Sequence, residues 1–165
     1  MDNSKELKSI IKNQRNFFNT NATKSVEYRL RMLQRLKKII SDNEDKILSV
    51  LYKDLSKSKS EAYMSEVAMV YAELDEALKK VREWSRPQRA RGTIGTFPAK
   101  NYVFSEPYGI VLIMSPWNYP FNLAIAPLIA AISAGNCAVI KCSKESKYTS
   151  NLIKEIINNT FDKNY

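Results

Sequence analysis

The pattern of apolar and polar positions divides the chain into a helical first half and a mixed second half. In the first half, apolar residues recur every three or four positions, which is typical of helices that bury one face. The pattern predicts helices over residues 1–19, 26–40, 44–55 and 58–84. The stretches Ser-Asp-Asn-Glu at 41–44 and Ser-Lys-Ser-Glu at 58–61 have the spacing of a capping box, so each predicts a helix start.

The second half begins with residues 86–96, whose two glycines and one proline predict a loop, and continues with an extended segment at 96–105. Residues 109–114 are apolar and rich in β-branched side chains, which predicts a strand buried on both faces. An apolar helix is predicted over 121–133, because Gly135 and Asn136 follow it as stop signals. A second strand at 137–140 and a last helix at 146–160 complete the pattern.

The order strand, helix, strand predicts a βαβ unit with parallel strands and a right-handed crossover. The polar residues Ser115, Asn118, Lys141 and Ser143 fall at the C-terminal ends of its two strands. In open α/β sheets this edge is where ligands bind. The sequence therefore predicts an α/β fold with a ligand site at this edge.

Composition and charge narrow the class of protein. The 165 residues suit one ordinary domain, and 26 Lys and Arg against 17 Asp and Glu give a net charge of +9. Residues 1–100 hold 21 of the basic and 13 of the acidic residues, interleaved and without a nucleic-acid-binding motif. A solvated helical face is thus preferred over a nucleic-acid site, although a positive field can also attract small anions.

The N-terminus is polar and charged, so we expect no signal peptide and a cytoplasmic location. Residues 121–140 have membrane-like length, but Asn122, Pro127 and Gly135 interrupt them, which favours a buried helix and strand over a transmembrane segment. Two Cys in such a chain are expected to be reduced thiols. With no His, a conventional zinc site is not expected.

Asn118 is the sharpest candidate for chemistry. Its amide offers two N–H donors, which beside a helix N-terminus can point at a developing oxyanion. The alternative is that Asn118 only caps the helix, and the residues alone favour that interpretation. On the same grounds Trp117 is a core aromatic, Lys141 a surface lysine and Cys137 a small buried apolar residue.

Several motifs follow one another in a specific order. They are Glu106-Pro107 with Gly109, Pro116-Trp117-Asn118-Tyr119-Pro120, Ala134-Gly135-Asn136, and Lys141 with Ser143. Together they closely resemble the aldehyde dehydrogenase superfamily, strongly from about residue 96 onward. Thr-Phe-Pro-Ala-Lys at 96–100 and the run PWNYPFNL resemble its class 3, fatty-aldehyde-type branch.

The resemblance implies a role for each candidate. Asn118 would stabilise the oxyanion of the thiohemiacetal that forms on a catalytic Cys. The cofactor-binding residues, for NAD or NADP, would be Met114, Ser115, Pro116 and Trp117 on the nicotinamide-ribose side, and Lys141, Ser143 and Lys144 at the adenosine ribose.

The chain departs from the family where Pro becomes Cys142 and Glu becomes Lys144. Two cations at the ribose edge predict that NADP binds at least as well as NAD. Neither Cys142 nor Cys137 matches the family nucleophile.

The resemblance also implies a division of the chain. Residues 1–95 would be the helical region of the cofactor-binding domain, 96–106 an extended arm used in subunit association, and 107–165 the first part of an NAD(P)-binding Rossmann-like domain. In the family the nucleophile and the general base lie C-terminal to this region. We therefore expect an N-terminal fragment, inactive alone, that oxidises an aldehyde only when completed.

Two other classes of protein remain open. The chain could be an interaction module that pairs with a separate C-terminal half or a full-length relative. It could instead be a basic helical protein that binds nucleic acid or an anionic membrane, which would require strongly salt-dependent binding. An unpaired apolar strand edge would also favour self-association.

Overall fold

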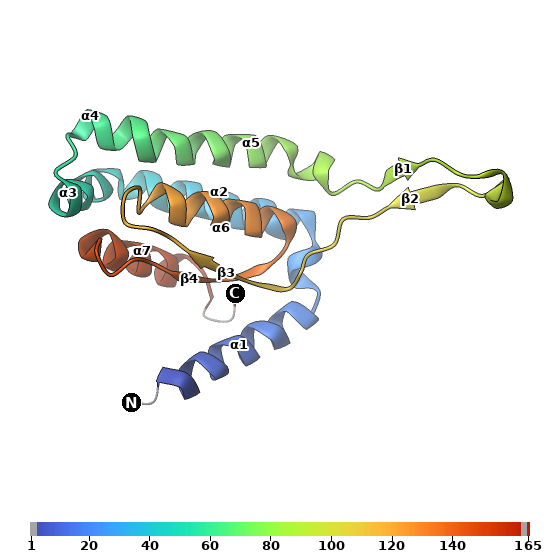
Figure 1. Cartoon of the computed structure of the whole chain (residues 1–165), viewed down its shortest axis with the longest axis horizontal. Helices are drawn as coiled ribbons and strands as arrows, with labels where there is room; N and C mark the ends of the chain where they lie inside the picture. The colour runs from blue at the N-terminus through green and yellow to red at the C-terminus, as the bar shows by residue number, and fades with distance from the viewer. Residues whose placement is uncertain (1–2, 163–164) are drawn as a thin grey trace.

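The computed structural model, which describes residues 3–162 and 165, has the predicted helical first half (Figure 1). Its elements are α1 (Asn3–Asn19), a 3₁₀ turn η1 (Ala22–Lys24), α2 (Val26–Asp42), α3 (Glu44–Leu55), α4 (Lys59–Ala62), a π-helical turn η2 (Tyr63–Val67) and α5 (Ala68–Trp84). The apolar stripes that predicted these helices supply most of the core. Leu33, Leu36, Ile40, Ile47, Leu51 and Leu74 are fully buried.

The second half contains the predicted βαβ unit. Its elements are β1 (Gln88–Ala90), a 3₁₀ turn η3 (Ile94–Thr96), β2 (Asn101–Val103), β3 (Ile110–Met114), α6 (Asn122–Ala134), β4 (Cys137–Lys141) and α7 (Lys147–Thr160). Strands β3 and β4 are parallel neighbours, with Ile110 opposite Cys137 and Met114 opposite Lys141. This confirms the predicted α/β class and the parallel strand pair.

The elements form layers around that strand pair. Helix α6 packs against α2 and α5 on one side of β3 and β4, and α1 contacts β3 from the other side (Figure 1). Helix α7 packs against α2 and α3. The buried residues Ile125, Ile129 and Ile132 of α6 join the core of the helical half, so the two halves form one folding unit.

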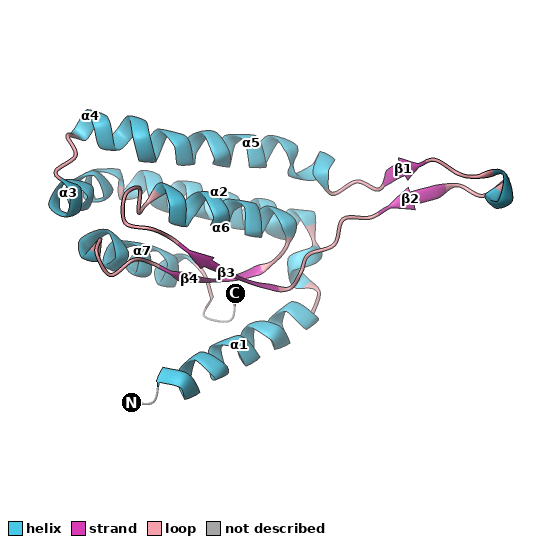
Figure 2. Cartoon of the chain, viewed as in Figure 1, coloured by secondary structure: helices cyan, strands magenta, loops and turns pink. Residues whose placement is uncertain are grey.

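A two-stranded hairpin projects from this body (Figure 2). It pairs β1 with β2 in antiparallel register, with Gln88 opposite Val103 and Ala90 opposite Asn101. The prediction of a loop over 86–96 was therefore wrong, because β1 lies within that stretch. The reason is physical: both strands are largely exposed, so β1 carries no alternation of apolar and polar residues that could reveal it.

The two predicted capping boxes had different outcomes. Ser58 Oγ accepts a hydrogen bond from the Glu61 N–H at 3.2 Å and caps α4 as predicted. The box at 41–44 was wrong, because α2 continues through Ser41 to Asp42. Only Asn43 separates α2 from α3, and its side chain donates back to the Ile39 carbonyl. So short a connection leaves no room for a separate cap.

Strand β3 also corrects a prediction. Ile113 is buried, but Leu112 is 60% and Met114 is 68% exposed. Since side chains alternate across a strand, one face of β3 is covered here and the other face is open toward its C-terminal end. The strand is therefore not buried on both faces within this chain.

Gly135 provides a test of how the helical half packs against α6. It ends α6 with φ +86°, and a Cβ built there would lie 2.8 Å from the Thr23 carbonyl oxygen and 2.9 Å from Arg29 Nε. Left-handed backbone and a clash with main chain both penalise a side chain. We expect Gly135→Ala to lower the free energy of unfolding by about 2 kcal/mol or more.

Thermal unfolding of the chain, followed by circular dichroism, measures this loss. Gly95→Ala is the matched control, because its Cβ would meet only Thr93 Oγ1, at 3.9 Å. Equal melting temperatures for the two variants would contradict the packing described for Gly135.

Candidate functional site

The polar segments that follow β3 and β4 lie side by side. Because Met114 pairs with Lys141, the two strands end at the same level, and the Ser115 N–H donates to the Lys141 carbonyl at 3.1 Å. Ser115 is buried, whereas Pro116 and Trp117 are exposed. The fold thus brings together the two groups of residues predicted to form the site.

Asn118 lies in the turn between β3 and α6, and its side chain is exposed. Its amide makes no hydrogen bond to any of residues 3–162 or to Tyr165. The alternative of a helix cap is wrong, because α6 has Phe121 at its N-cap and no cap from a neighbouring side chain in the turn. The amide is therefore available to a ligand.

The N-terminus of α6 is capped instead by a buried carboxylate from the π-helical turn. Glu66 is fully buried, and its Oε2 accepts from the N–H groups of Phe121 at 2.9 Å and Asn122 at 3.2 Å. Its Oε1 accepts from Lys57 Nζ at 2.6 Å. A carboxylate at a helix N-terminus is favoured by the helix dipole, and the lysine neutralises its charge.

Lys57 itself contacts the turn. Its Nζ donates to the Asn118 carbonyl oxygen at 3.0 Å and lies 4.0 Å from the centre of the Tyr119 ring. Its side chain is only 10% exposed, so this is a buried ion pair. The sequence analysis did not predict this pair. The available signal was the position of Glu66, which lies beside Val67 and four residues before Val70, among apolar residues that are buried.

The last residue of β4 and the loop after it carry the other predicted residues. Lys141 and Lys144 are exposed and form no ion pair with any described residue. The Ser143 hydroxyl accepts from the Glu145 N–H at 3.2 Å, while the Ser143 carbonyl accepts from Ser150 Oγ at 2.9 Å. The serine thus shapes the loop and leaves both ammonium groups free.

Helix α7, which follows this loop, is also capped by a carboxylate from the helical half. Asp54 accepts from the N–H groups of Tyr148 at 3.1 Å and Thr149 at 2.7 Å. Helix N-termini often bind phosphate in dinucleotide-binding folds. Here Glu66 caps the N-terminus of α6 and Asp54 caps that of α7. An anionic ligand at this edge would therefore meet Lys141 and Lys144 instead.

Neither thiol in the chain is activated. Burial raises the pKa of the Cys137 thiol to about 11. Burial also raises the pKa of Cys142, an effect that the Ser115 and Ser150 hydroxyls and Lys141 oppose. Because the thiolate is the nucleophile, both side chains are poorly suited to attack a carbonyl near neutral pH.

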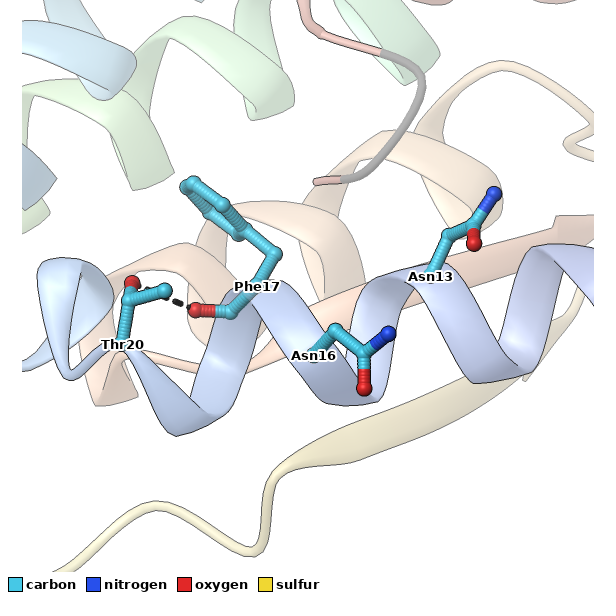
Figure 3. A pocket seen from close by; sticks show the side chains of 4 residues that line it. All are labelled: Asn13, Asn16, Phe17 and Thr20. Carbon is cyan, nitrogen blue, oxygen red and sulfur yellow. Dashed lines mark hydrogen bonds between the residues drawn. The ribbon is translucent and has the colours of Figure 1, made fainter.

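Two hollows of the described surface lie away from this edge. One, of about 300 Å³, is lined by Asn13, Asn16 and Phe17 of α1 and by Thr20 in the turn that follows it (Figure 3). Another, of about 320 Å³, lies near the base of the hairpin, beside Arg29 and Glu106. Neither contains a predicted site residue.

Two further features concern the described part of the chain. No cluster of three or more Cys, Asp or Glu side chains there could hold a metal ion. None of its helices combines the length and apolarity needed to cross a membrane.

The described residues thus form an α/β protein with a parallel βαβ unit, at whose carboxyl edge Asn118, Lys141 and Lys144 are exposed. The aldehyde dehydrogenase family model matches residues 1–164, and the chain belongs to that family. This confirms the resemblance carried by the sequence motifs.

Similar proteins include members of family 3. The 4,4'-diaponeurosporen-aldehyde dehydrogenase of Staphylococcus aureus is 44% identical over 149 residues, which is 90% of this chain and 32% of that protein. Aldehyde dehydrogenase family 3 member B1 of Rattus norvegicus is 40% identical over 143 residues, 87% of this chain and 31% of that protein. The chain therefore spans about a third of the length of the curated relatives it matches.

Solved structures share the fold. A substrate-bound Staphylococcus aureus AldH matches with a TM-score of 0.94 and 41% identity, over 96% of this chain and 35% of that one. Relatives bound to NADP also have this fold, among them a succinic semialdehyde dehydrogenase from Streptococcus pyogenes, with a TM-score of 0.82 at 18% identity over 97% of this chain and 34% of that one.

Proposed function

We propose that this chain supplies the N-terminal region of an NAD(P)-dependent aldehyde dehydrogenase, with Asn118 as a donor to the reaction's oxyanion. The observation that carries the proposal is the state of the Asn118 side chain. It is exposed at the carboxyl edge of the parallel strands and forms no hydrogen bond with the described residues, while the main-chain carbonyl of Asn118 accepts from Lys57. A donor arranged in this way suits a ligand atom that gains negative charge.

The chemistry assigned to this region is electrostatic. In the complete enzyme a thiolate outside this chain would add to the aldehyde carbonyl, whose oxygen would then carry negative charge. The Asn118 amide would donate to that oxygen in the thiohemiacetal. A bound nicotinamide cofactor supplies the hydride acceptor of the oxidation.

The residues after the strands fit such a cofactor. Met114, Ser115, Pro116 and Trp117 would line its nicotinamide-ribose side, and Lys141, Ser143 and Lys144 its adenosine ribose. The exposed ammonium groups of Lys141 and Lys144, which form no ion pair within the described part of the chain, can pair with the 2′-phosphate of NADP. They cannot accept a hydrogen bond from the ribose hydroxyl that NAD presents.

Replacing Lys144 by Glu should therefore shift cofactor preference toward NAD. The carboxylate would accept from a ribose hydroxyl and repel the 2′-phosphate. We expect the NADP-to-NAD affinity ratio to fall about fivefold to tenfold, which corresponds to about 1 kcal/mol for one partly exposed charge pair. Cofactor titration of the complete enzyme measures the ratio, with Lys154→Glu on the exposed side of α7 as the control. An unchanged ratio would remove Lys144 from the site.

The open face of β3 supports the second part of the proposal, which concerns partners. Leu112 and Met114 are large, apolar and mostly exposed, next to the exposed Trp117. Contiguous apolar side chains of this kind mark an interaction surface. We infer that the remaining region of an aldehyde dehydrogenase, or a second copy of this chain, covers them.

A chimera tests the proposed function. In it, this chain replaces the matching third of the Staphylococcus aureus relative. If the chain supplies an aldehyde dehydrogenase N-terminal region, the chimera should form NAD(P)H with an aldehyde that the parent enzyme oxidises. A chimera that folds and assembles like its parent but forms no NAD(P)H would contradict the proposal.

A further inference from the structure

The buried pair of Lys57 and Glu66 holds the main chain on both sides of Tyr119, directly after the Asn118 side chain. Lys57 lies between α3 and α4, and Glu66 lies in the π-helical turn that follows α4. Both belong to the end of the helical layer at which α6 begins (Figure 1). Neither contacts the predicted cofactor residues in any bond described above.

Each polar atom of the pair has a defined task. The Lys57 ammonium donates to Glu66 Oε1 at 2.6 Å and to the Asn118 carbonyl at 3.0 Å, and it faces the Tyr119 ring at 4.0 Å. Glu66 Oε2 then accepts from the two N–H groups that start α6. The main chain of the turn is held before and after Tyr119, yet the Asn118 side-chain amide forms no hydrogen bond with residues 3–162 or Tyr165.

π-Helical turns inside α-helices occur frequently at functional sites. Here the turn places a fully buried carboxylate against the start of α6. A buried ion pair is a poor device for stability alone, because apolar residues of similar volume often stabilise as well or better. Its contacts instead hold the main chain that carries the exposed Asn118 amide. A donor whose backbone is already held needs less reorganisation during the reaction.

We propose that Lys57 and Glu66 are positioning residues that orient the Asn118 amide toward the oxyanion, an inference that rests on the proposed function of Asn118. Lys57→Met removes the donor to the Asn118 carbonyl and keeps an unbranched side chain that is one atom shorter. Displacement of a reacting group by about 1 Å costs up to about 100-fold in rate. We therefore expect kcat of the active chimera to fall about 10-fold to 100-fold, with the KM for aldehyde changed less than about threefold.

A double-mutant cycle separates positioning from general damage. If Lys57 acts through Asn118, Lys57→Met should lower kcat by less than about twofold once Asn118→Ala is present. Lys37→Met is the matched control, because Lys37 pairs with Asp75 on the surface between α2 and α5. That variant should leave kcat unchanged in both backgrounds.

The outcomes are distinct. If Lys57→Met lowers kcat by the same factor in the wild-type and Asn118→Ala backgrounds, the positioning role is overturned and the proposed function still stands. A wild-type rate in Asn118→Ala would overturn both. Because Lys57→Met leaves Glu66 buried without its partner, the same cycle is also run with the Lys57→Met/Glu66→Gln variant, which contains neither charge. That variant should show the same loss of kcat and the same dependence on Asn118.

Discussion

Asn118→Ala is expected to lower kcat of the active chimera by about 100-fold or more. One oxyanion donor is worth about 3 kcal/mol of transition-state stabilisation, and alanine removes both N–H groups of the amide. The loss should appear in kcat and in kcat/KM together, because the donor acts on charge that develops during the reaction. Steady-state rates of NAD(P)H formation measure it.

Stability distinguishes this role from a structural one. The Asn118 side chain is exposed and forms no bond with the described residues, so Asn118→Ala should change the free energy of unfolding of the chain by less than about 0.5 kcal/mol. Asn158→Ala, at an exposed position of α7, is the control for the same substitution and should keep full activity. Wild-type turnover in Asn118→Ala would refute the oxyanion role.

The sequence predicts those parts of the fold that depend on periodic burial. The stripes of α2, α3 and α5 and the apolar run of β3 are visible because each buries one set of side chains. Strand β1 was not visible, since its pairing with β2 uses main-chain bonds and exposed side chains. The prediction that β3 is buried on both faces was wrong for a related reason. An apolar run indicates that the side chains are to be buried, but it does not show whether residues of this chain bury them.

The candidate site likewise contains residues that could be predicted from the sequence and others that could not. Ser115, Asn118, Lys141 and Ser143 could be placed at one edge because parallel strands bring their C-terminal ends together. The role of Glu66 could not be predicted, because it depends on a π-helical turn and on two N–H groups that lie 55 and 56 residues further along the chain. Local sequence also suggested that Asn118 was the cap of α6, and a distant carboxylate takes that place.

The second large effect is on stability, and it concerns Lys57 in the chain alone. Lys57→Met leaves the fully buried Glu66 carboxylate with two main-chain donors but no cation. Breaking a buried pair by removing one partner costs about 3–5 kcal/mol. For a chain of this size we expect the melting temperature to fall by roughly 10 °C.

The loss of stability in Lys57→Met should come from the unpaired charge of Glu66 and not from the absence of the lysine side chain. Lys57→Met/Glu66→Gln removes both charges and keeps an acceptor for the Phe121 N–H, so it should regain most of the lost stability. Lys37→Met breaks an exposed pair with Asp75 and should cost less than about 1 kcal/mol. Thermal and urea unfolding of the three variants provide the comparison. If Lys57→Met is no less stable than Lys37→Met, Glu66 is not held as a buried charge, and the anchoring of the Asn118 turn described above is incorrect.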